Sequence, residues 1–340
     1  MCLLTGVNGD IWVAARPMNG AADAVRTLVQ LDPHGSLDPR VSEIPGGSPK
    51  GTLARLVGLE ACARTPEGTL VIAHRGGQLG SQELPVEPGV AYVSRLLATS
   101  PVVAFETVTI PFPAQALEVA WDGTYVVAAD QDVGGVQIAR VRRDGVRLSV
   151  STPPMAGFRV RKLVRDGRSI VVAGMLDGGA AVPSAALGRL EDGRVTWTTA
   201  RALADLETSL APRDRFGLSV DDVGHAYVAI GPGVTVGRFA AGEAAVDEAF
   251  GDRGKVQLTQ DGVTWDAVAV AGSRLVVATS AGLVRMTEEG ELDSGYGEGG
   301  RAPIHYATSQ PLRISGTPDG AVLLAGLGPA GVVEVTRFTP

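Results

Sequence analysis

The sequence predicts an all-β repeat fold, and three observations lead to that prediction. First, seven Gly-containing turns recur along the chain, at Gly9, Gly68, Gly123, Gly167, Gly224, Gly272 and Gly320. Second, an apolar strand rich in Val and Ala follows each turn, as in "TYVVAA" and "RLVVAT". Third, two more strands fit before the next turn. Four antiparallel strands in a period of about 50 residues are typical of a β-propeller blade. The sequence therefore predicts a seven-bladed β-propeller of four-stranded antiparallel blades.

The first turn of each blade is predicted from its glycine. Asp-Gly or Asn-Gly between two apolar strands favours a tight hairpin, because glycine adopts the positive φ that the turn requires. The strands after these turns are apolar on both faces, which is typical of strands packed between two neighbouring sheets.

Further hairpins complete the blades in chain order. "VQIARVRRDGVRLSVS" turns at Gly145, "SAALGRLEDGRVTWTT" at Gly193 and "TLVQLDPHGSLDPRV" at Gly35. Helical periodicity is nearly absent, and residues 201–211 are the one segment expected to form a short helix, within a loop. The result is a single propeller domain over 1–340, with blades near 1–54, 55–113, 114–157, 158–214, 215–262, 263–309 and 310–340.

The last blade is expected to be incomplete, because the sequence ends after "VVEVTRFTP" without a fourth strand. Two explanations stay open: the blade has three strands, or residues outside this stretch supply the fourth. An open β-solenoid is the alternative architecture. It is less favoured, because hairpins rather than single rungs repeat here.

Composition excludes several classes of protein. The 340 residues are 45% hydrophobic and carry a net charge of −7, with only three lysines, so a phosphate-binding surface for nucleic acid is not expected. No apolar run approaches the roughly 18 residues of a membrane span. The first ten residues also lack the basic start of a signal peptide.

The two cysteines, Cys2 and Cys62, are too few for a disulfide scaffold or a zinc ribbon. Cys62 falls in a predicted innermost strand and is expected to be a small buried hydrophobic residue. Cys2 could be the lipid-anchor cysteine of an exported form, although no flexible tether follows it.

An eleven-residue pattern occurs twice. "VDEAFGDRGKV" begins at residue 246 and "LDSGYGEGGRA" at residue 292, so the copies are 292 − 246 = 46 residues apart. Repeats at such a period indicate a repeat architecture. In the first copy, Asp247 is followed by Phe250, Gly251 and Gly254; in the second, Leu292 and Asp293 are followed by Tyr296, Gly297 and Gly300.

With Arg238 and Arg285 on the strands before them, these segments resemble the bacterial delta-60 repeat. Its pattern is an arginine-bearing strand, a Gly turn, Leu-Asp and Phe-Gly-x-x-Gly. Residues 28–41 keep Leu37 and Asp38 but lose the aromatic and glycines. The match covers about a quarter of the chain. The resemblance implies a secreted or surface-attached propeller, and it brings no catalytic motif.

We interpret the eleven-residue pattern as structural. The Asp side chain can cap the turn, the glycines allow positive φ, and the aromatic residue is expected to fill the seam between blades. A phosphate-binding glycine loop is not favoured, because it requires a strand-to-helix transition and no helix follows.

Two groups of residues are candidates for function. In a propeller the longer connections lie opposite the Gly hairpins, and loops on a rigid scaffold commonly carry function; from them we select Arg75, Arg213 and Arg215. Counting back from the hairpin glycines places charged residues on the innermost strands, near the axis. These axial candidates are Glu60, Glu118, Arg159, Arg161, Asp266 and Arg313, with Trp265 as a stacking wall. They are expected either to pair with each other in a solvated channel, or to bind a small polar ligand.

No metal or cofactor is expected. The histidines (His34, His74, His225 and His305) are not at ligand spacing. "AADQDVGG", residues 128–135, has calcium-like Asp spacing but lacks the bidentate Glu. The chain also has no G-x-S-x-G nucleophile elbow.

The leading functional hypothesis is a non-enzymatic, exported bacterial propeller that presents its loop face to a protein or glycan partner. The alternative is an enzyme, a lyase or hydrolase of a small polar or sugar substrate, with its site among the axial candidates. A third hypothesis is a structural module of a larger surface protein.

Overall fold

The structure is a computed structural model that contains strands and no helix in the residues it describes. These residues are 2–6, 9–15, 25–41, 51–98, 104–131, 135–153, 156–176, 184–191, 196–207, 216–230, 234–240, 242, 245–258, 265–279, 281–304, 313–317, 319–327 and 333–339. The helix prediction for 201–211 is wrong over 201–207, and 208–211 lie outside the described residues. Residues Thr196–Glu207 form strand β18, because pairing with the neighbouring strand outweighs the local pattern.

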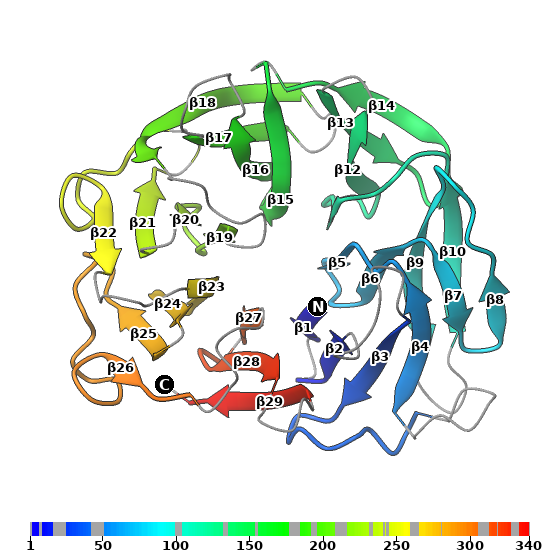
Figure 1. Cartoon of the computed structure of the whole chain (residues 1–340), viewed down its shortest axis with the longest axis horizontal. Coiled ribbons are helices and arrows are strands. Elements are labelled where there is room, and N and C mark those ends of the chain that lie inside the picture. Colours follow the sequence, from blue (N-terminus) through cyan, green and yellow to red (C-terminus); the bar gives the residue numbers. More distant parts are fainter. Residues whose placement is uncertain are drawn as a thin grey trace. The chain divides into compact units, whose positions relative to one another are not determined.

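The chain divides into two compact units. The first comprises Met1–Gln131 and Gln137–Val150, and the second Asp132–Val136 and Ser151–Pro340. Figure 1 traces the strands of each unit in chain order.

The first unit contains three antiparallel sheets. Sheet 1 has the order β1 (Cys2–Thr5), β2 (Ile11–Ala15), β3 (Arg26–Leu31), β4 (Thr52–Val57), β7 (Gly76–Leu79) and β8 (Gln82–Leu84). Sheet 2 has the order β10 (Ala104–Ile110), β9 (Ala91–Ala98), β6 (Leu70–His74) and β5 (Ala61–Arg64). Sheet 3 runs β11 (Ala116–Val119), β12 (Tyr125–Gln131), β13 (Gly135–Val141) and β14 (Arg147–Ser151).

The second unit contains four sheets of consecutive strands. Sheet 4 comprises β15 (Phe158–Asp166), β16 (Ser169–Leu176), β17 (Ser184–Glu191) and β18, and sheet 5 comprises β19 (Phe216–Val220), β20 (Ala226–Ile230), β21 (Val234–Phe239) and β22 (Lys255–Leu258). Sheet 6 comprises β23 (Trp265–Ala271), β24 (Arg274–Thr279), β25 (Gly282–Met286) and β26 (Arg301–Ala302), and sheet 7 comprises β27 (Arg313–Gly316), β28 (Val322–Leu327) and β29 (Val333–Phe338).

The seven predicted hairpin glycines all connect the first and second strands of a sheet. Their φ values run from +57° at Gly167 to +90° at Gly224, so the predicted backbone requirement is confirmed. We call the end of a sheet with these turns its hairpin end, and the opposite end its loop end.

The core lies between successive sheets of each unit. All five residues of β6 and all five of β20 are buried, as predicted for strands covered on both faces. The first strands also lie side by side, β1 with β5 and β5 with β11 in one unit, and β15, β19, β23 and β27 in sequence in the other. First-strand residues of neighbouring sheets are therefore brought together within each unit.

Two sheets depart from four strands. Sheet 7 has three in the described residues, as predicted for the last blade. Sheet 1 has six, because one of the longer connections, from β6 to β9, is partly strand. It forms the β7–β8 hairpin, and β7 pairs with β4 of the neighbouring sheet. A Cβ at Gly77 would lie 2.2 Å from the Arg55 carbonyl oxygen, so this pairing requires glycine.

Candidate functional site

The eleven-residue pattern is a seam between sheets. In sheet 5, the Arg238 guanidinium lies 2.8 Å from the Asp247 carboxylate and 5.1 Å from the centre of the Phe250 ring. Phe250 is fully buried in a cluster that includes Met286 of sheet 6. Arg238 also donates to the Glu288 carbonyl of sheet 6. The predicted role of the aromatic residue in the seam is confirmed.

Sheet 6 repeats this arrangement. Arg285 Nε lies 3.0 Å from Asp293 Oδ2, and the guanidinium lies 4.3 Å from the Tyr296 ring centre. The Asp also caps its turn as predicted, because Asp293 Oδ1 accepts a hydrogen bond from Gly295 N at 3.2 Å. Backbone bonds from Arg285 N to Gly300 O and from Asp293 N to Arg285 O close the loop.

Sheet 1 has the same loop without the full sequence pattern. Gln30 replaces the arginine and donates to Asp38 Oδ2 at 3.0 Å, while buried Val41 replaces the aromatic residue. Arg40 supplies the positive charge and lowers the pKa of Asp38 through its hydrogen bonds. All three loops are thus held together by structural contacts.

The axial candidate Glu60 and the loop-face candidate Arg75 meet at the loop end of the first unit. Arg75 Nε lies 3.6 Å from Glu60 Oε1, and each side chain is 39% exposed. Burial raises the pKa of Glu60, and the positive charges of Arg75 and Arg26 oppose this shift. Arg75 also lies against Gly58, which has a φ of +58°. The structure therefore joins two residues that the sequence had assigned to separate groups.

The other axial candidates lie on first strands of the two units. Glu118, on β11, accepts a hydrogen bond from the backbone N–H of Val119 at 2.8 Å. Arg159 and Arg161 lie on β15, where Arg159 is exposed and the strand register shifts around Arg161. Arg313 begins β27 and is half-buried.

Four candidates are described partly or not at all. Trp265 and Asp266 lie on β23, with a register shift between Trp265 and Ala267, and only their backbone is described. Arg213 and Arg215 lie outside the described residues, as do His305 and Asp132 of the calcium-like segment.

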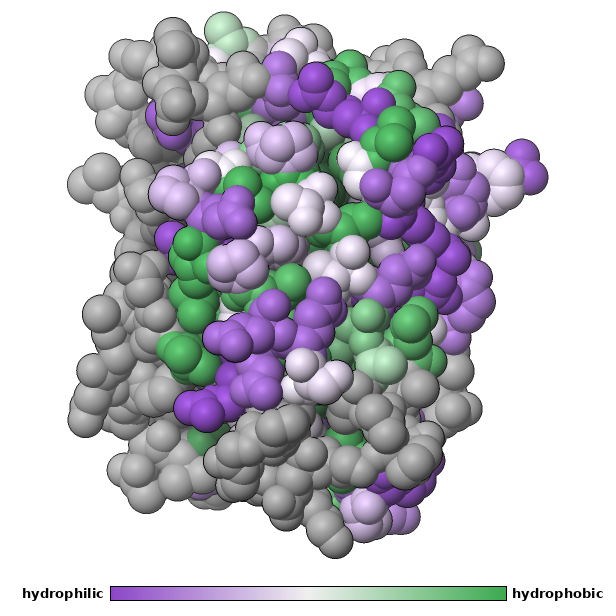
Figure 2. Space-filling view, turned by 90° about the vertical axis from the view of Figure 1, so that its right-hand side faces the viewer, coloured by the Kyte–Doolittle hydropathy of each residue, from purple (hydrophilic) through white to green (hydrophobic). Residues whose placement is uncertain are grey.

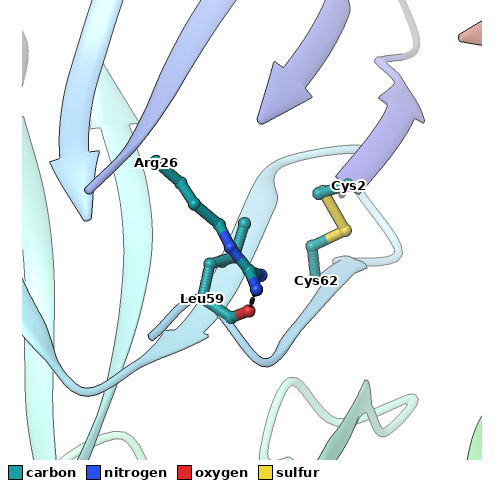
Figure 3. The surroundings of a disulfide bond; sticks show 4 residues. All are labelled: Cys2, Arg26, Leu59 and Cys62. Atoms are coloured by element: carbon teal, nitrogen blue, oxygen red, sulfur yellow. Dashed lines mark hydrogen bonds between the residues drawn. A yellow bond between two sulfur atoms is a disulfide. The ribbon is translucent and has the colours of Figure 1, made fainter. Parts of the chain in front are cut away.

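Cys62 lies on the first strand β5 as predicted, but the predictions of a free buried Cys62 and a lipid-anchor Cys2 are wrong. Cys2 and Cys62 form a disulfide between β1 and β5, with the two Cα atoms 6.2 Å apart (Figure 3). Nearby, Arg26 of β3 donates to the Leu59 carbonyl immediately before β5. The bond could not be predicted from the sequence, because the two cysteines are 60 residues apart and no motif links them. The cysteines meet because the first strands of sheets 1 and 2 are neighbours.

His74 forms a buried polar chain that the sequence did not predict. Its Nε2 lies 2.9 Å from Ser94 Oγ, which lies 2.9 Å from Thr107 Oγ1, and Gln82 of β8 is the next contact. Nδ1 donates to the Gly76 carbonyl at 3.1 Å. Burial lowers the pKa of His74 to about 4, so the ring is neutral at pH 7. Ser94 is fully buried, so this pair is not an accessible nucleophile.

Among the residues described, no group of three or more His, Cys, Asp or Glu side chains is placed so that it could hold a metal ion. His225 illustrates this. Its Nδ1 lies 2.9 Å from Asp221 Oδ2 and its Nε2 lies 3.7 Å from Asp247 Oδ2, so both ring nitrogens face carboxylates of the hairpin end. In the described part of the chain there is likewise no helix that could span a membrane.

Comparison with known proteins defines the fold. No protein-family model and no curated protein matches the chain. It is similar to the β-propeller domain of the Trilobed protease from Pyrococcus furiosus, with a TM-score of 0.56 and 8% identity over 99% of this chain and 94% of that one. That domain is described as having an open velcro topology.

Two other solved structures are similar over nearly all of this chain. One is the extracellular domain of a putative one-component system from B. thetaiotaomicron, with a TM-score of 0.53, 12% identity, and coverage of 99% of this chain and 39% of that one. The other is prolyl oligopeptidase B from Galerina marginata, with a TM-score of 0.56, 9% identity, and coverage of 100% and 48%. The chain spans less than half the length of these two proteins.

At such identities these similarities define the fold alone. Together with the seven antiparallel sheets, they establish the chain as a seven-bladed β-propeller. Propellers serve many functions, so the function has to be argued from the site.

Proposed function

We propose that this protein is a non-enzymatic binding propeller of an oxidising, extracytoplasmic compartment, and that its loop end contacts a protein or glycan partner. We also propose that it is related to the delta-60 repeat propellers, on the residues of sheets 5 and 6 that resemble this repeat.

The Cys2–Cys62 disulfide supports the compartment. It is the one observation on which this part of the proposal depends. Disulfides form and persist in oxidising environments and are rare in reducing cytosol. Both cysteines are used in the bond, which is consistent with a structural rather than a reactive role.

The loop end of the first unit supports the binding role. Residues 85–89, "PVEPG", are all exposed between β8 and β9, and Val86 is 53% exposed. Two prolines restrict this segment, so it would lose little conformational freedom on binding. Arg75 and Glu60 add an exposed ion pair at the same end.

Figure 2 shows the side of the molecule on which β7, β8 and β10 lie. Hydrophilic side chains run along this side in rows, with exposed hydrophobic side chains between them. A mixed surface of this kind fits a non-obligate partner better than a permanent apolar interface.

Glu60 favours a second function. Its raised pKa, next to Arg75, is the property that a general acid requires. The enzyme hypothesis, a lyase or hydrolase of a small polar or sugar substrate, therefore places its acid at Glu60.

Binding of the wild-type protein to arrays of surface glycans and extracellular proteins tests the proposal. We expect a signal that is lost in Arg75→Ala and in Val86→Asp. Val223→Asp is the matched control, because Val223 is 64% exposed at a hairpin turn of the second unit. Melting temperatures should stay unchanged in all three variants, because each side chain is partly exposed.

Three results would count against this proposal. A signal that survives both loop-end substitutions would exclude the loop end as the binding surface. Turnover of an arrayed substrate that Glu60→Gln abolishes would favour the enzyme. Free thiols at both cysteines in protein alkylated at the moment of cell lysis would exclude the oxidising compartment.

A further inference from the structure

One arginine position repeats through the sheets. It lies on the third strand of the sheet. Its partner across the strand pair is a second-strand residue, three or four positions after the hairpin glycine. The arginines at this position are Arg95, Arg189, Arg238, Arg285 and Arg337. In sheet 3, Arg140 lies at the corresponding place near the end of β13. Sheet 1 has Gln30 at this position instead of an arginine.

Five of these six arginines pair with an aspartate of the chain. The pairs are Arg140 with Asp122, Arg189 with Asp166, Arg238 with Asp247, Arg285 with Asp293 and Arg337 with Asp319. Even Gln30 donates to an aspartate, Asp38. The position therefore has a consistent chemical requirement, a carboxylate next to the third-strand side chain.

Arg95 is the exception. It makes no hydrogen bond or ion pair with any residue the structure describes, and its Nε is buried without a partner there. Glu67 occupies the turn position that Asp122 and Asp319 occupy in sheets 3 and 7. The Glu67 carboxylate accepts hydrogen bonds from its own backbone and from Thr65, which lower its pKa, and the charges of Arg95 and Arg143 lower it further without a hydrogen bond to either arginine.

A second unusual residue faces the same seam, between sheets 2 and 3. Tyr125 begins β12 and packs in the cluster that contains Val71 of sheet 2. The corresponding second-strand residues of the other sheets are all apolar: Ile11, Leu70, Ile170, Ala226, Leu275 and Val322. Tyr125 is 1% exposed, and among the described residues its hydroxyl has no hydrogen-bond partner.

The two groups belong to one charged cluster. Glu106 lies directly opposite Arg95 in the β9–β10 register. The charges of Glu106, Arg143 and Arg95 all act on the Tyr125 hydroxyl. Arg143 is half-buried and donates to the Gly123 carbonyl at 3.3 Å, and Trp121 of the same turn is 50% exposed.

We infer that the hairpin end of the seam between sheets 2 and 3 binds a small zwitterionic ligand of the amino-acid class, whose carboxylate takes the place of the aspartate that Arg95 lacks. Arg95 is the primary donor to this carboxylate and the Tyr125 hydroxyl is the second. Glu106 and Glu67 face the ammonium group.

The ligand class follows from the charges of the cluster. A guanidinium binds a carboxylate through charge-assisted hydrogen bonds, which are the strong ones. Two arginines alone would favour any small anion, but Glu106 and Glu67 make the cluster neutral and repel a simple anion. A zwitterion can place its carboxylate next to the arginines and its ammonium group next to Glu106 and Glu67. This inference does not depend on the proposed function, because the cluster lies at the end of the strands opposite Arg75 and Val86.

Isothermal titration with the common amino acids, each with its carboxamide and its N-acetyl derivative, tests the ligand class. We expect at least one free amino acid to bind. Amidation of its carboxyl group should weaken binding about tenfold or more, because a hydrogen bond to a charged group is lost. N-acetylation should weaken it as well.

Three variants test the site. Arg95→Gln reproduces the residue that sheet 1 has at this position, and should reduce affinity about tenfold or more. Tyr125→Phe removes only the hydroxyl and should reduce affinity severalfold without lowering the melting temperature. Glu67→Asp introduces the residue that pairs with the arginine in sheets 3 and 7. It should form an ion pair with Arg95, abolish binding and raise the melting temperature.

Arg140→Gln is the matched control, because Arg140 has its own aspartate. This variant should lose stability and keep its affinity. The inference is overturned if no free amino acid binds at millimolar concentration, if carboxamides bind as well as free acids, or if Arg95→Gln and Glu67→Asp leave affinity unchanged while melting temperatures show that they fold. Failure here leaves the loop-end array result unaffected, so the two proposals are tested separately.

Discussion

Gly251 and Gly297 occupy the same place in sheets 5 and 6, and neither has room for a side chain. Their φ values are +57° and +53°. A Cβ at Gly251 would lie 2.2 Å from the Lys255 carbonyl oxygen, and one at Gly297 would lie 1.9 Å from that of Arg301. Both the backbone conformation and the close approach of a carbonyl therefore require glycine.

Replacing either glycine with valine should destabilise the protein by about 1–3 kcal/mol, because a β-branched residue is strained at positive φ. Chemical denaturation of Gly251→Val and Gly297→Val measures this. Gly299→Val is the control for φ alone, since Gly299 also has positive φ (+58°) but no atom within 4 Å of the position that a Cβ would occupy. An unchanged unfolding free energy at Gly251 and Gly297 would contradict the proposed role of these glycines.

At the scale of elements, the β7–β8 hairpin depends on contacts with two sheets. It pairs with β4 of sheet 1, and the chain His74–Ser94–Thr107–Gln82 connects it to sheet 2. His74 also holds the carbonyl of Gly76, the first residue of β7. This chain requires a neutral imidazole, because His74 is fully buried and no carboxylate contacts it in the described structure.

The His74 chain should make stability depend on pH. The pKa of His74 falls from 6.5 to about 4 on folding, so the unfolded chain binds more protons between these values. Stability is therefore full above pH 6.5 and is lost as the pH falls towards 4. The loss from this group is about 3 kcal/mol, since one pKa unit corresponds to about 1.4 kcal/mol.

Urea unfolding at several pH values between 7 and 4 measures this effect. His74→Gln is the control, because a glutamine keeps hydrogen bonding but does not titrate. The variant should lose less stability than the wild type over this interval. Equal slopes for both proteins would show that His74 is not the titrating group.

At the scale of the whole molecule, the chain contains two compact units and one disulfide, and the disulfide lies entirely within the first unit. It joins the first strands of sheets 1 and 2, 60 residues apart in sequence. Its effect on stability should therefore depend on the unit in which it is measured.

Replacing both cysteines with serine should destabilise the first unit by about 2–4 kcal/mol, because the unfolded chain gains the freedom of a long loop. Hydrogen exchange resolved by peptide measures each unit separately. We expect faster exchange in residues 2–131 and 137–150 and unchanged exchange in the second unit. Equal acceleration in both units would show that the molecule unfolds as one cooperative body.

Much of the strand order was predictable because it depends on local chemistry. The seven hairpin glycines and the buried second strands follow from turn residues and short apolar runs, which act between near neighbours in sequence. Where pairing is non-local, prediction failed. Residues 201–207 became part of strand β18 through pairing with β17, and β7 became a strand by pairing with β4 of another sheet.

The candidate site was less predictable than the fold, since it depends on which side chains meet across a seam. Glu60 and Arg75 were selected separately and form one ion pair. The sequence did not indicate Tyr125 as a binding residue, because tyrosine is common in apolar strands. Only the structure shows that its buried hydroxyl lacks a hydrogen-bond partner among the described residues.

The sequence by itself determined the class of fold, the number of sheets and the structural role of the repeated Asp, Gly and aromatic residues, because each depends on backbone preferences a few residues long. Only the tertiary structure decided that Cys2 and Cys62 are bonded, that His74 is buried and neutral, and that Arg95 is the one arginine of its series without a described aspartate partner. These properties depend on distances and burial between different sheets, which no local pattern records.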